Sequence, residues 1–343
     1  MNEQKVSVVI LAAGKGTRMK SAQAKVMHQV FFKPMIHHVL DALTPLPVHQ
    51  TVVVTGHQAE RVEQACAGYG ARFARQHEQL GTGHAVLAAE SSLSAAGEVV
   101  MILCGDTPLI RTGTLQAMIN EHLAGSHKLT VMTTVVDDPT NYGRIIVSDS
   151  GHVQEIVEEK DASTAQKKIK EINAGIYCVE KNFLFSALRQ VGTDNKQGEV
   201  YLTDIIAIAH SAGEQVQRFF CSRSEETLGV NSRYELSLAH ATLQRRFLRR
   251  LMDQGVTCVL PDTITISGEV SIGRDTIISP NVSITGRTSI GDNCHVATFS
   301  CLVDSQLGDN VFVGEFSYLN GITVADNDRI VTCSCMNNKI AEQ

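Results

Sequence analysis

Residues Val6–Met19 read VSVVILAAGKGTRM and join a short apolar run to a basic, glycine-rich loop. The run Val6–Ala13 is apolar and rich in β-branched residues, which is typical of a strand buried on both faces. Glycines in the loop let backbone N–H groups approach a ligand closely, and consecutive amides form an anion-binding nest. Positive charge is added nearby by Lys15, Arg18, Lys20 and Lys25. The segment therefore predicts a strand whose carboxyl end binds a polyphosphate.

Two other glycine-rich motifs fit this loop poorly. A P-loop needs G-x-x-x-x-G-K-[ST], but here Lys15 is followed by Gly16. A dinucleotide fingerprint needs a third glycine, where this chain has Met19, and an acidic residue about 20 positions later at a strand end. Asp41 has roughly that offset, but it lies in a stretch with helical patterning. For the loop taken alone, a plain strand-to-helix turn remains the alternative interpretation.

Composition bounds the class of protein. The chain has 343 residues, enough for two or three domains, and its moderate charge indicates a soluble globular protein. The net charge of −6 argues against a general nucleic-acid binder, which needs a broad basic face. The N-terminal apolar run has only about eight residues and leads directly into the glycine-rich motif, so we expect neither a signal peptide nor a membrane span. Nine cysteines without paired spacing fit a reducing cytoplasm.

Residues 5–230 alternate short apolar strands with helical stretches, so we expect an α/β domain with a mostly parallel sheet covered on both faces. The expected strands are Val6–Ala12, Thr51–Val54, Val99–Leu103, Leu129–Val135, Arg144–Val147, Ala174–Val179 and Gln217–Phe220. The expected helices include Pro34–Leu43, Ala59–Cys66, Gly83–Ser91, Thr112–Ala124, Asn182–Leu188 and Thr203–Ser211. Ligands of such sheets bind beyond the carboxyl ends of strands, where Gly14 and Asp106 should face one crevice.

The remainder of the chain has a different pattern. After one helical stretch, an aliphatic residue recurs every six positions and, after one slip, resumes; the series is Leu260, Ile266, Ile272, Ile278, Ile284, Ile290, Val296, Leu302, Leu307, Val313 and Leu319. This period is typical of a hexapeptide β-helix, in which each hexad forms one short strand with its aliphatic residue inward. We therefore expect a first domain at 1–232, a linking helix at 233–255, a β-helix at 256–328 and a polar or frayed tail at 329–343.

Several further blocks accompany Leu11–Met19 and Lys25, in this order: Gln79–Ala85, Gly105–Leu109, Asp138–Ile145, Val157–Ala162, Glu171–Ile176, Gly198–Asp204 and Gly229–Asn231. With these blocks the chain resembles the sugar-phosphate nucleotidyltransferases. More narrowly, residues 5–300 resemble the uridylyltransferase half of the bacterial bifunctional N-acetylglucosamine-1-phosphate uridylyltransferase/glucosamine-1-phosphate acetyltransferase family.

The resemblance implies a Rossmann-like nucleotidyltransferase domain followed by a short left-handed parallel β-helix that assembles as a homotrimer. It also implies Mg²⁺-dependent transfer of UMP from UTP to N-acetylglucosamine 1-phosphate. The products would be pyrophosphate and UDP-N-acetylglucosamine, a precursor of peptidoglycan and lipopolysaccharide. Such a transfer depends on positioning and electrostatics rather than on a covalent nucleophile.

The resemblance assigns roles to individual residues. Arg18 and Lys25 are the expected catalytic cations at the α-phosphate. The expected nucleotide contacts are Leu11, Ala12, Ala13, Gly14, Lys25, Gln76, Gly81 and Thr82, with Gln76 and Gly81 near the uracil. The expected sugar contacts are Cys104, Gly105, Gly143, Glu158, Asn173 and Asn231. Oxygen ligands suit Mg²⁺, and the implied metal ligands are Asp106 and Asn231.

The sequence departs from the family pattern in places. Ala24 replaces a usual proline, Cys104 a common aromatic residue and Ala174 a usual threonine. Because Cys104 and Ala174 lie in sugar-binding blocks, transfer to another sugar 1-phosphate is an alternative function. The short solenoid carries no second-site motif around His295, so we expect no acetyltransferase activity. A catalytically silent nucleotide-binding assembly protein is the remaining alternative.

Overall fold

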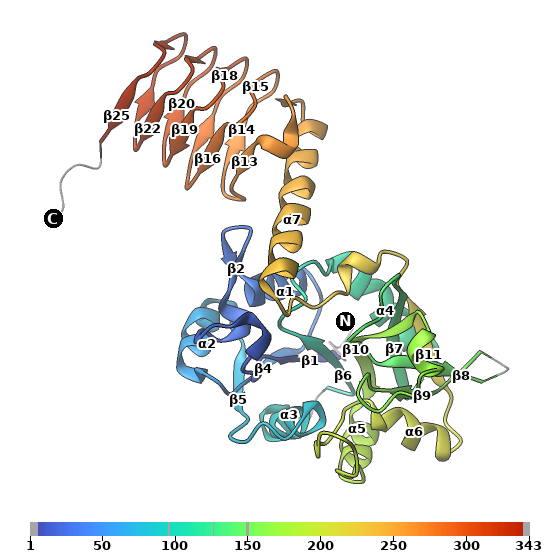
Figure 1. Ribbon diagram of the computed structural model, residues 1–343. Coiled ribbons are helices and arrows are strands. Elements are labelled where there is room, and N and C mark those ends of the chain that lie inside the picture. The colour runs from blue at the N-terminus through green and yellow to red at the C-terminus, as the bar shows by residue number, and fades with distance from the viewer. Residues whose placement is uncertain (1–5, 95–96, 126, 149–150, 339–343) are drawn as a thin grey trace. The chain divides into compact units, whose positions relative to one another are not determined.

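The computed structural model describes residues 6–94, 97–125, 127–148 and 151–338. The chain divides into a first unit, residues 1–236, and a second unit, residues 237–343. The division falls inside helix α7 (Arg233–Asp253) (Figure 1). Among the described residues, no helix combines the length and apolar character needed to span a membrane.

A nine-stranded sheet forms the centre of the first unit. Its main order is β11-β7-β10-β6-β1-β4-β5, and β8 and β9 form a hairpin attached to β10. β10 runs antiparallel to both of its neighbours in this order, whereas the other neighbouring pairs are parallel, which confirms the predicted mostly parallel sheet. The strands are β1 (Val6–Leu11), β4 (Gln50–Thr55), β5 (Arg72–Arg75), β6 (Val99–Cys104), β7 (Leu129–Val135), β8 (Arg144–Val147), β9 (Val153–Val157), β10 (Glu171–Glu180) and β11 (Val216–Phe220).

Helices cover both faces of this sheet. β1 shows why, because its alternate side chains enter two separate apolar clusters: Val8 and Ile10 lie in one and Val9 in the other. The first cluster includes residues of α1, α2 and α4, and the second residues of α3, α5 and α6. These helices are α1 (Met35–Leu43), α2 (Ala59–Cys66), α3 (Thr82–Ala89), α4 (Thr112–Gly125), α5 (Lys181–Leu188) and α6 (Asp204–Ser211).

The second unit contains a solenoid of short parallel strands in three sheets, consistent with the predicted left-handed β-helix (Figure 1). One sheet has the order β12-β15-β18-β21-β24, the second β13-β16-β19-β22-β25 and the third β14-β17-β20-β23. The strands are β12 (Thr257–Cys258), β13 (Thr265–Ile266), β14 (Ser271–Ile272), β15 (Ile277–Ile278), β16 (Ser283–Thr285), β17 (Ser289–Ile290), β18 (His295–Val296), β19 (Cys301–Val303), β20 (Gln306–Leu307), β21 (Phe312–Val313), β22 (Tyr318–Asn320), β23 (Thr323–Val324), β24 (Arg329–Ile330) and β25 (Cys335–Asn337).

One corner of the solenoid accounts for the slip after Leu302. The corner between β16 and β17 consists of residues 286–288, but the equivalent corner between β19 and β20 consists only of residues 304–305. Gly286 and Asp304 both adopt positive φ at this corner, so the chain still turns there. The shorter corner keeps Leu307 buried and paired in register with Ile290.

The structure corrects two details of the expected solenoid. Leu260 is 64% exposed and adopts positive φ just before a 3₁₀ turn (Pro261–Thr263), so it is not an inward residue. The residue paired with Ile278 is Cys258, because the inserted turn changes the spacing of the first coil. At the other end, β24 and β25 continue the parallel pairing to Asn337, past the expected boundary at 328. Residues 339–343 of the expected tail lie outside the described residues.

Leu302 and Leu260 share the six-residue spacing but differ in burial, which makes them a matched pair. Leu302→Ala removes a side chain that is 0% exposed and is expected to lower the free energy of unfolding of the solenoid by about 2–5 kcal/mol. Leu260→Ala is expected to change it by less than about 0.5 kcal/mol. Urea unfolding of the full chain, followed by circular dichroism, measures both; equal losses would contradict the inward assignment of Leu302.

Candidate active site

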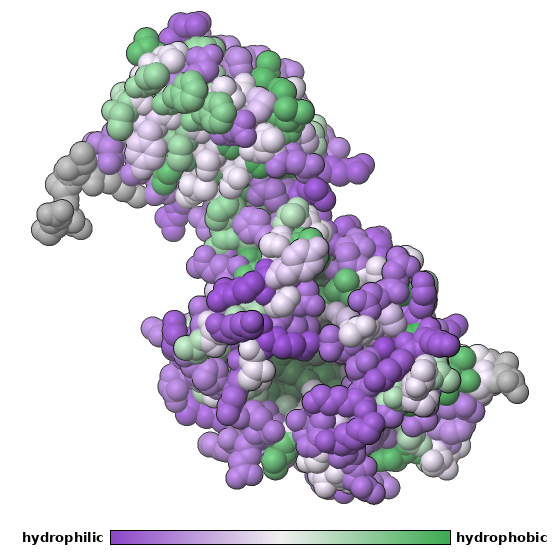
Figure 2. All heavy atoms as spheres, in the orientation of Figure 1, coloured by the Kyte–Doolittle hydropathy of each residue, from purple (hydrophilic) through white to green (hydrophobic). Residues whose placement is uncertain are grey.

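The carboxyl ends of β1 and β6 lie side by side and open into a pocket. Leu11 pairs with Cys104, and the amide of Gly105 donates to the carbonyl of Leu11 over 2.9 Å. The pocket has a volume of about 270 Å³ and is lined by Leu11, Ala12, Ala13, Gly14, Lys25, Val26, Gln76, Gln79, Gly81, Thr82, Ala85, Cys104, Asp106 and Glu199. It therefore gathers every residue expected to contact the nucleotide. On the visible face of the first unit, Figure 2 shows a hollow with a more hydrophobic floor and a hydrophilic rim.

The loop after β1 leaves backbone donors available. Within the described part of the chain, the amides of Ala13, Gly14 and Lys15 donate to no protein acceptor. A Cβ built on Gly14 would meet nothing within 4 Å, so open space adjoins the backbone here. At Gly16, φ is +65° and a Cβ would lie 2.6 Å from Cβ of Lys25. A glycine at this position lets the loop pack directly on the Lys25 stem, beside amides suited to an anion.

Cations and oxygen ligands from separate segments meet next to this loop. The Lys25 ammonium forms an ion pair with Asp106 and donates to Oδ1 of Asn231 over 2.8 Å. Nη2 of Arg18 donates to the same oxygen over 2.9 Å. Asp106 lies shortly after β6 and Asn231 lies two residues before α7, so the fold assembles this group from distant parts of the sequence.

Asn231 is held by the cap of helix α7. Oε2 of Glu235 accepts hydrogen bonds from the amide of Asn231 over 2.7 Å and from the hydroxyl of Ser232 over 3.1 Å. In return, the hydroxyl of Ser232 accepts from the amide of Glu235 over 3.2 Å. This arrangement is a variant of the capping box. Glu235 was not among the predicted site residues, although the spacing Ser-x-x-Glu before a helix could have indicated its role.

A second hydrogen-bonded group includes the pocket residues Gln76, Gly81 and Thr82. Gln76 follows β5 and is 4% exposed, and its Nε2 lies 3.1 Å from the carbonyl oxygen of Gly81 and 3.0 Å from Nδ1 of His84. Gly81 has φ +108°, and a Cβ there would lie 2.5 Å from the carbonyl oxygen of Val200. The hydroxyl of Thr82 accepts a hydrogen bond from the amide of Leu202 over 3.1 Å. His84 was not among the predicted site residues.

Four of the six residues expected to contact the sugar, namely Cys104, Gly143, Glu158 and Asn173, also come together. The amide of Asn173 donates to the carbonyl of Gly143 over 2.9 Å, and a Cβ on Gly143 would lie 3.7 Å from Oε1 of Glu158. The side chain of Asn173 spans an irregular part of β10, where its Oδ1 accepts from the amide of Gly175 over 2.9 Å. A Cβ on Gly175 would lie 3.2 Å from Sγ of Cys104. These contacts join residues next to β8 and β9 to β10 and, through Gly175, to Cys104 at the end of β6.

Comparison of the sequence with known proteins shows the family of the chain. The MobA-like NTP transferase domain family matches residues 8–260. A bifunctional protein GlmU from Desulfotalea psychrophila is 48% identical over 328 residues, which cover 96% of this chain and 97% of that protein. This chain belongs to the GlmU family of nucleotidyltransferases. GlmU proteins of Heliobacterium modesticaldum and Listeria innocua are 48% and 47% identical over 303 and 297 residues, and the matched region spans only 66% and 65% of their lengths.

In this GlmU-family chain, the Cys104 thiol is a poor nucleophile. Burial, together with the negative charge of Asp106, raises the pKa of Cys104 to about 12. The thiol is therefore neutral near pH 7, and only a thiolate attacks readily. This state agrees with a transfer that uses no covalent enzyme intermediate.

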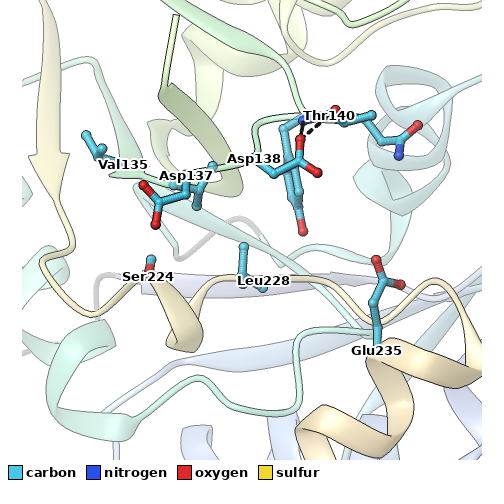
Figure 3. A pocket seen from close by; sticks show the side chains of 10 residues that line it. Val135, Asp137, Asp138, Thr140, Ser224, Leu228 and Glu235 are labelled. Atoms are coloured by element: carbon cyan, nitrogen blue, oxygen red, sulfur yellow. Dashed lines mark hydrogen bonds between the residues drawn. The ribbon is translucent and has the colours of Figure 1, made fainter.

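A larger, acidic pocket on the first unit includes Glu235, the residue that caps Asn231, in its lining (Figure 3). Its volume is about 460 Å³, and its lining includes the carboxylates of Asp137, Asp138 and Glu235. Figure 3 shows Asp138 accepting hydrogen bonds from the amide and hydroxyl of Thr140, over 3.1 and 2.6 Å. No lysine or arginine lines this pocket within the described residues, so its charge disfavours a polyphosphate. The smaller pocket, which includes Gly14 and Lys25, is therefore the better candidate for binding a nucleotide.

Two adjacent glutamates have opposite pKa shifts. Burial raises the pKa of Glu158, and the nearby charges of Asp204 and Asp161 act in the same direction, although a hydrogen bond from Thr203 opposes them. Burial also acts to raise the pKa of Glu159, but the hydrogen bond and charge of Arg144 outweigh it and lower the pKa overall. Arg144 is almost fully buried and lies 2.5 Å from Glu159. Ionised Glu158 therefore opposes folding, whereas ionised Glu159 supports it.

The pair predicts opposite effects of the same substitution. Glu158→Gln is expected to raise the melting temperature at pH 8, where ionisation carries its full cost, and the gain should vanish below the ordinary glutamate pKa. Glu159→Gln should lower the free energy of unfolding by about 3 kcal/mol at pH 8, because the substitution leaves Arg144 without its carboxylate partner. This loss of stability should shrink as the pH falls. Thermal unfolding between pH 4 and pH 8 tests both. Shifts of the same sign at pH 8 would contradict the assignment.

Proposed function

We propose that this chain transfers UMP from UTP to N-acetylglucosamine 1-phosphate, giving UDP-N-acetylglucosamine and pyrophosphate. The observation that carries the proposal is the convergence of Arg18, Lys25, Asp106 and Asn231 beside the donor-rich loop after β1. That arrangement suits a triphosphate, and it occurs in a chain of the GlmU family. A nucleotidyl transfer needs reactant alignment and neutralisation of the charge that develops on the phosphates.

Each part of the site has a role in this proposal. The loop amides and Lys25 hold the phosphates, and the Arg18 guanidinium stabilises charge at the α-phosphate. The side-chain amide of Gln76 and the backbone of Gly81 contact the uracil. Sugar binding uses Glu158 as an acceptor for hydroxyl groups and Asn173 at the acetamido group; Cys104, Gly105, Gly143 and Asn231 complete the sugar site.

The residues present also fit Mg²⁺. Asp106 and Asn231 supply a carboxylate and an amide oxygen, the hard ligands that this ion prefers. Both side chains also bind the Lys25 ammonium, Asp106 through an ion pair and Asn231 through a hydrogen bond. No group of three or more His, Cys, Asp or Glu side chains suited to a metal occurs in the described residues. Two protein oxygens suffice for Mg²⁺, which usually keeps several waters and takes substrate phosphates. When bound, the ion would neutralise phosphate charge and orient the oxygens.

We further infer that acetyltransferase activity is absent and that the protein acts as a cytoplasmic homotrimer. The ring of His295 is already engaged, since its Nε2 lies 3.0 Å from the hydroxyl of Ser279 and it packs edge-on against Phe312. All nine cysteines are free thiols, as a reducing compartment requires. Phe299 and Phe316 stack at 5.2 Å and are more than half exposed, which suits an assembly surface. Light scattering distinguishes a trimer from a monomer.

Pyrophosphate release is the direct test of the proposed function. Purified protein with UTP, Mg²⁺ and N-acetylglucosamine 1-phosphate is expected to release pyrophosphate and to form UDP-N-acetylglucosamine. A panel of other hexose 1-phosphates, compared by kcat/KM, tests the second candidate that Cys104 suggests, because this small side chain lies in the pocket. Acetyl-CoA with glucosamine 1-phosphate should give no acetylated product. Binding of UTP without any turnover would instead favour a silent assembly protein.

Asp106→Asn tests the metal assignment. The variant keeps the shape of the side chain but removes its charge, so turnover should fall about 10²–10³-fold, and Mn²⁺ binding measured by electron paramagnetic resonance should weaken as well. Asp137→Asn is the matched control, because Asp137 is fully exposed and lies outside the nucleotide pocket. Near-parental Mn²⁺ affinity in Asp106→Asn would remove Asp106 from the metal site.

A further inference from the structure

His84 makes a contact that the proposed mechanism does not use. It lies in the first turn of α3, whose N-cap is Gly81, and its Nδ1 is 3.0 Å from Nε2 of Gln76. The same Nε2 donates to the carbonyl oxygen of Gly81 over 3.1 Å. A carbonyl oxygen can only accept, so the NH₂ end of the Gln76 amide faces Gly81 and His84.

Two acceptors therefore use both hydrogens of the Gln76 amide. For Nδ1 of His84 to accept, its ring proton must be on Nε2, which defines the tautomer. The carbonyl of Gly81 also accepts from the amide of Ala85 over 3.1 Å. One N–H of the Gln76 amide donates to Gly81, and the other donates to His84.

The remaining polar atom of the Gln76 side chain, Oε1, is available to accept a hydrogen bond from a ligand. Oε1 has no hydrogen-bond partner among the described residues, and it is not one of the buried atoms that solvent cannot reach. Gln76 itself is almost fully buried and lines the nucleotide pocket. The Gln76 side chain can therefore offer a ligand in the pocket only a hydrogen-bond acceptor.

We propose that His84 is a positioning residue for base selection: it holds the Gln76 amide so that only its oxygen faces the pyrimidine. This inference rests on the proposed use of UTP. Uracil presents an N3–H donor, which matches a lone acceptor, whereas N3 of cytosine is itself an acceptor. Two acceptors facing each other in a buried site leave both unsatisfied, and polar sites reject such mismatches strongly.

Loss of His84 removes one anchor of the amide. With only Gly81 left, the amide can rotate by 180° at lower cost and present its NH₂ group to the base. A rotated amide suits N3 of cytosine, so selectivity should fall more than overall activity does. A role of His84 in folding alone would lower the activity with both nucleotides by the same factor.

The test compares UTP and CTP as substrates of His84→Ala, His84→Asn and His77→Ala. The asparagine oxygen can replace Nδ1 as an acceptor, and exposed His77, next to Gln76, is the matched control. Values of kcat/KM come from pyrophosphate release, and binding of each nucleotide from calorimetry. The ratio of UTP to CTP should fall about 10–100-fold in His84→Ala, recover substantially in His84→Asn and stay unchanged in His77→Ala.

An unchanged ratio in folded His84→Ala, as checked by circular dichroism, would overturn the proposal. The calorimetric arm separates this failure from a failure of the proposed function. If the wild type binds UTP over CTP without turnover, the enzymatic proposal fails while the role of His84 is still measured. If the wild type turns over both nucleotides equally, the proposed nucleotidyl transfer is supported and the proposed role of His84 in base selection is refuted.

Discussion

The ion pair between Lys25 and Asp106 is the interaction on which the site depends. It joins the segment after β1 to the segment after β6, and Asn231 extends it to the start of α7. The side chains of Lys25 and Asp106 are both largely removed from solvent, so their attraction is screened less than that of an exposed pair. Three chain segments thereby converge where the β1 loop offers its free amides, and an anionic substrate can use donors that the fold has already oriented.

Much of this arrangement could be predicted from the sequence, because simple periodicities encode it. Buried strands such as β1 and β6 appear as short apolar runs, and the six-residue spacing marks the solenoid. The apolar runs placed Gly14 and Asp106 just past strand ends, where neighbouring parallel strands bring them together. These features depend on local composition and on one general rule of sheet topology, so no long-range contact had to be known in advance.

What could not be predicted depends on contacts between distant residues or on local irregularity. The pairing of Gln76 with His84 depends on the orientation of one side-chain amide, which no sequence pattern records. Leu260 follows the aliphatic spacing, yet an inserted 3₁₀ turn moves it to the surface. Neither β5 nor β9 was among the expected strands. β5 has arginines at both ends and lies at an edge of the sheet, and Gln154 and Glu155 interrupt β9, so both lack a continuous apolar run.

The variable corner of the solenoid has a consequence for how such a chain can change in length. The corner consists of residues 286–288 in one coil but only of residues 304–305 and 321–322 in the next two coils, while the paired strands keep their register. Deletion of one residue at this corner therefore leaves the facing of later side chains intact. Deletion within a strand would reverse that facing, because side chains alternate along a strand. Single-residue insertions and deletions should accordingly accumulate at this corner among related solenoids.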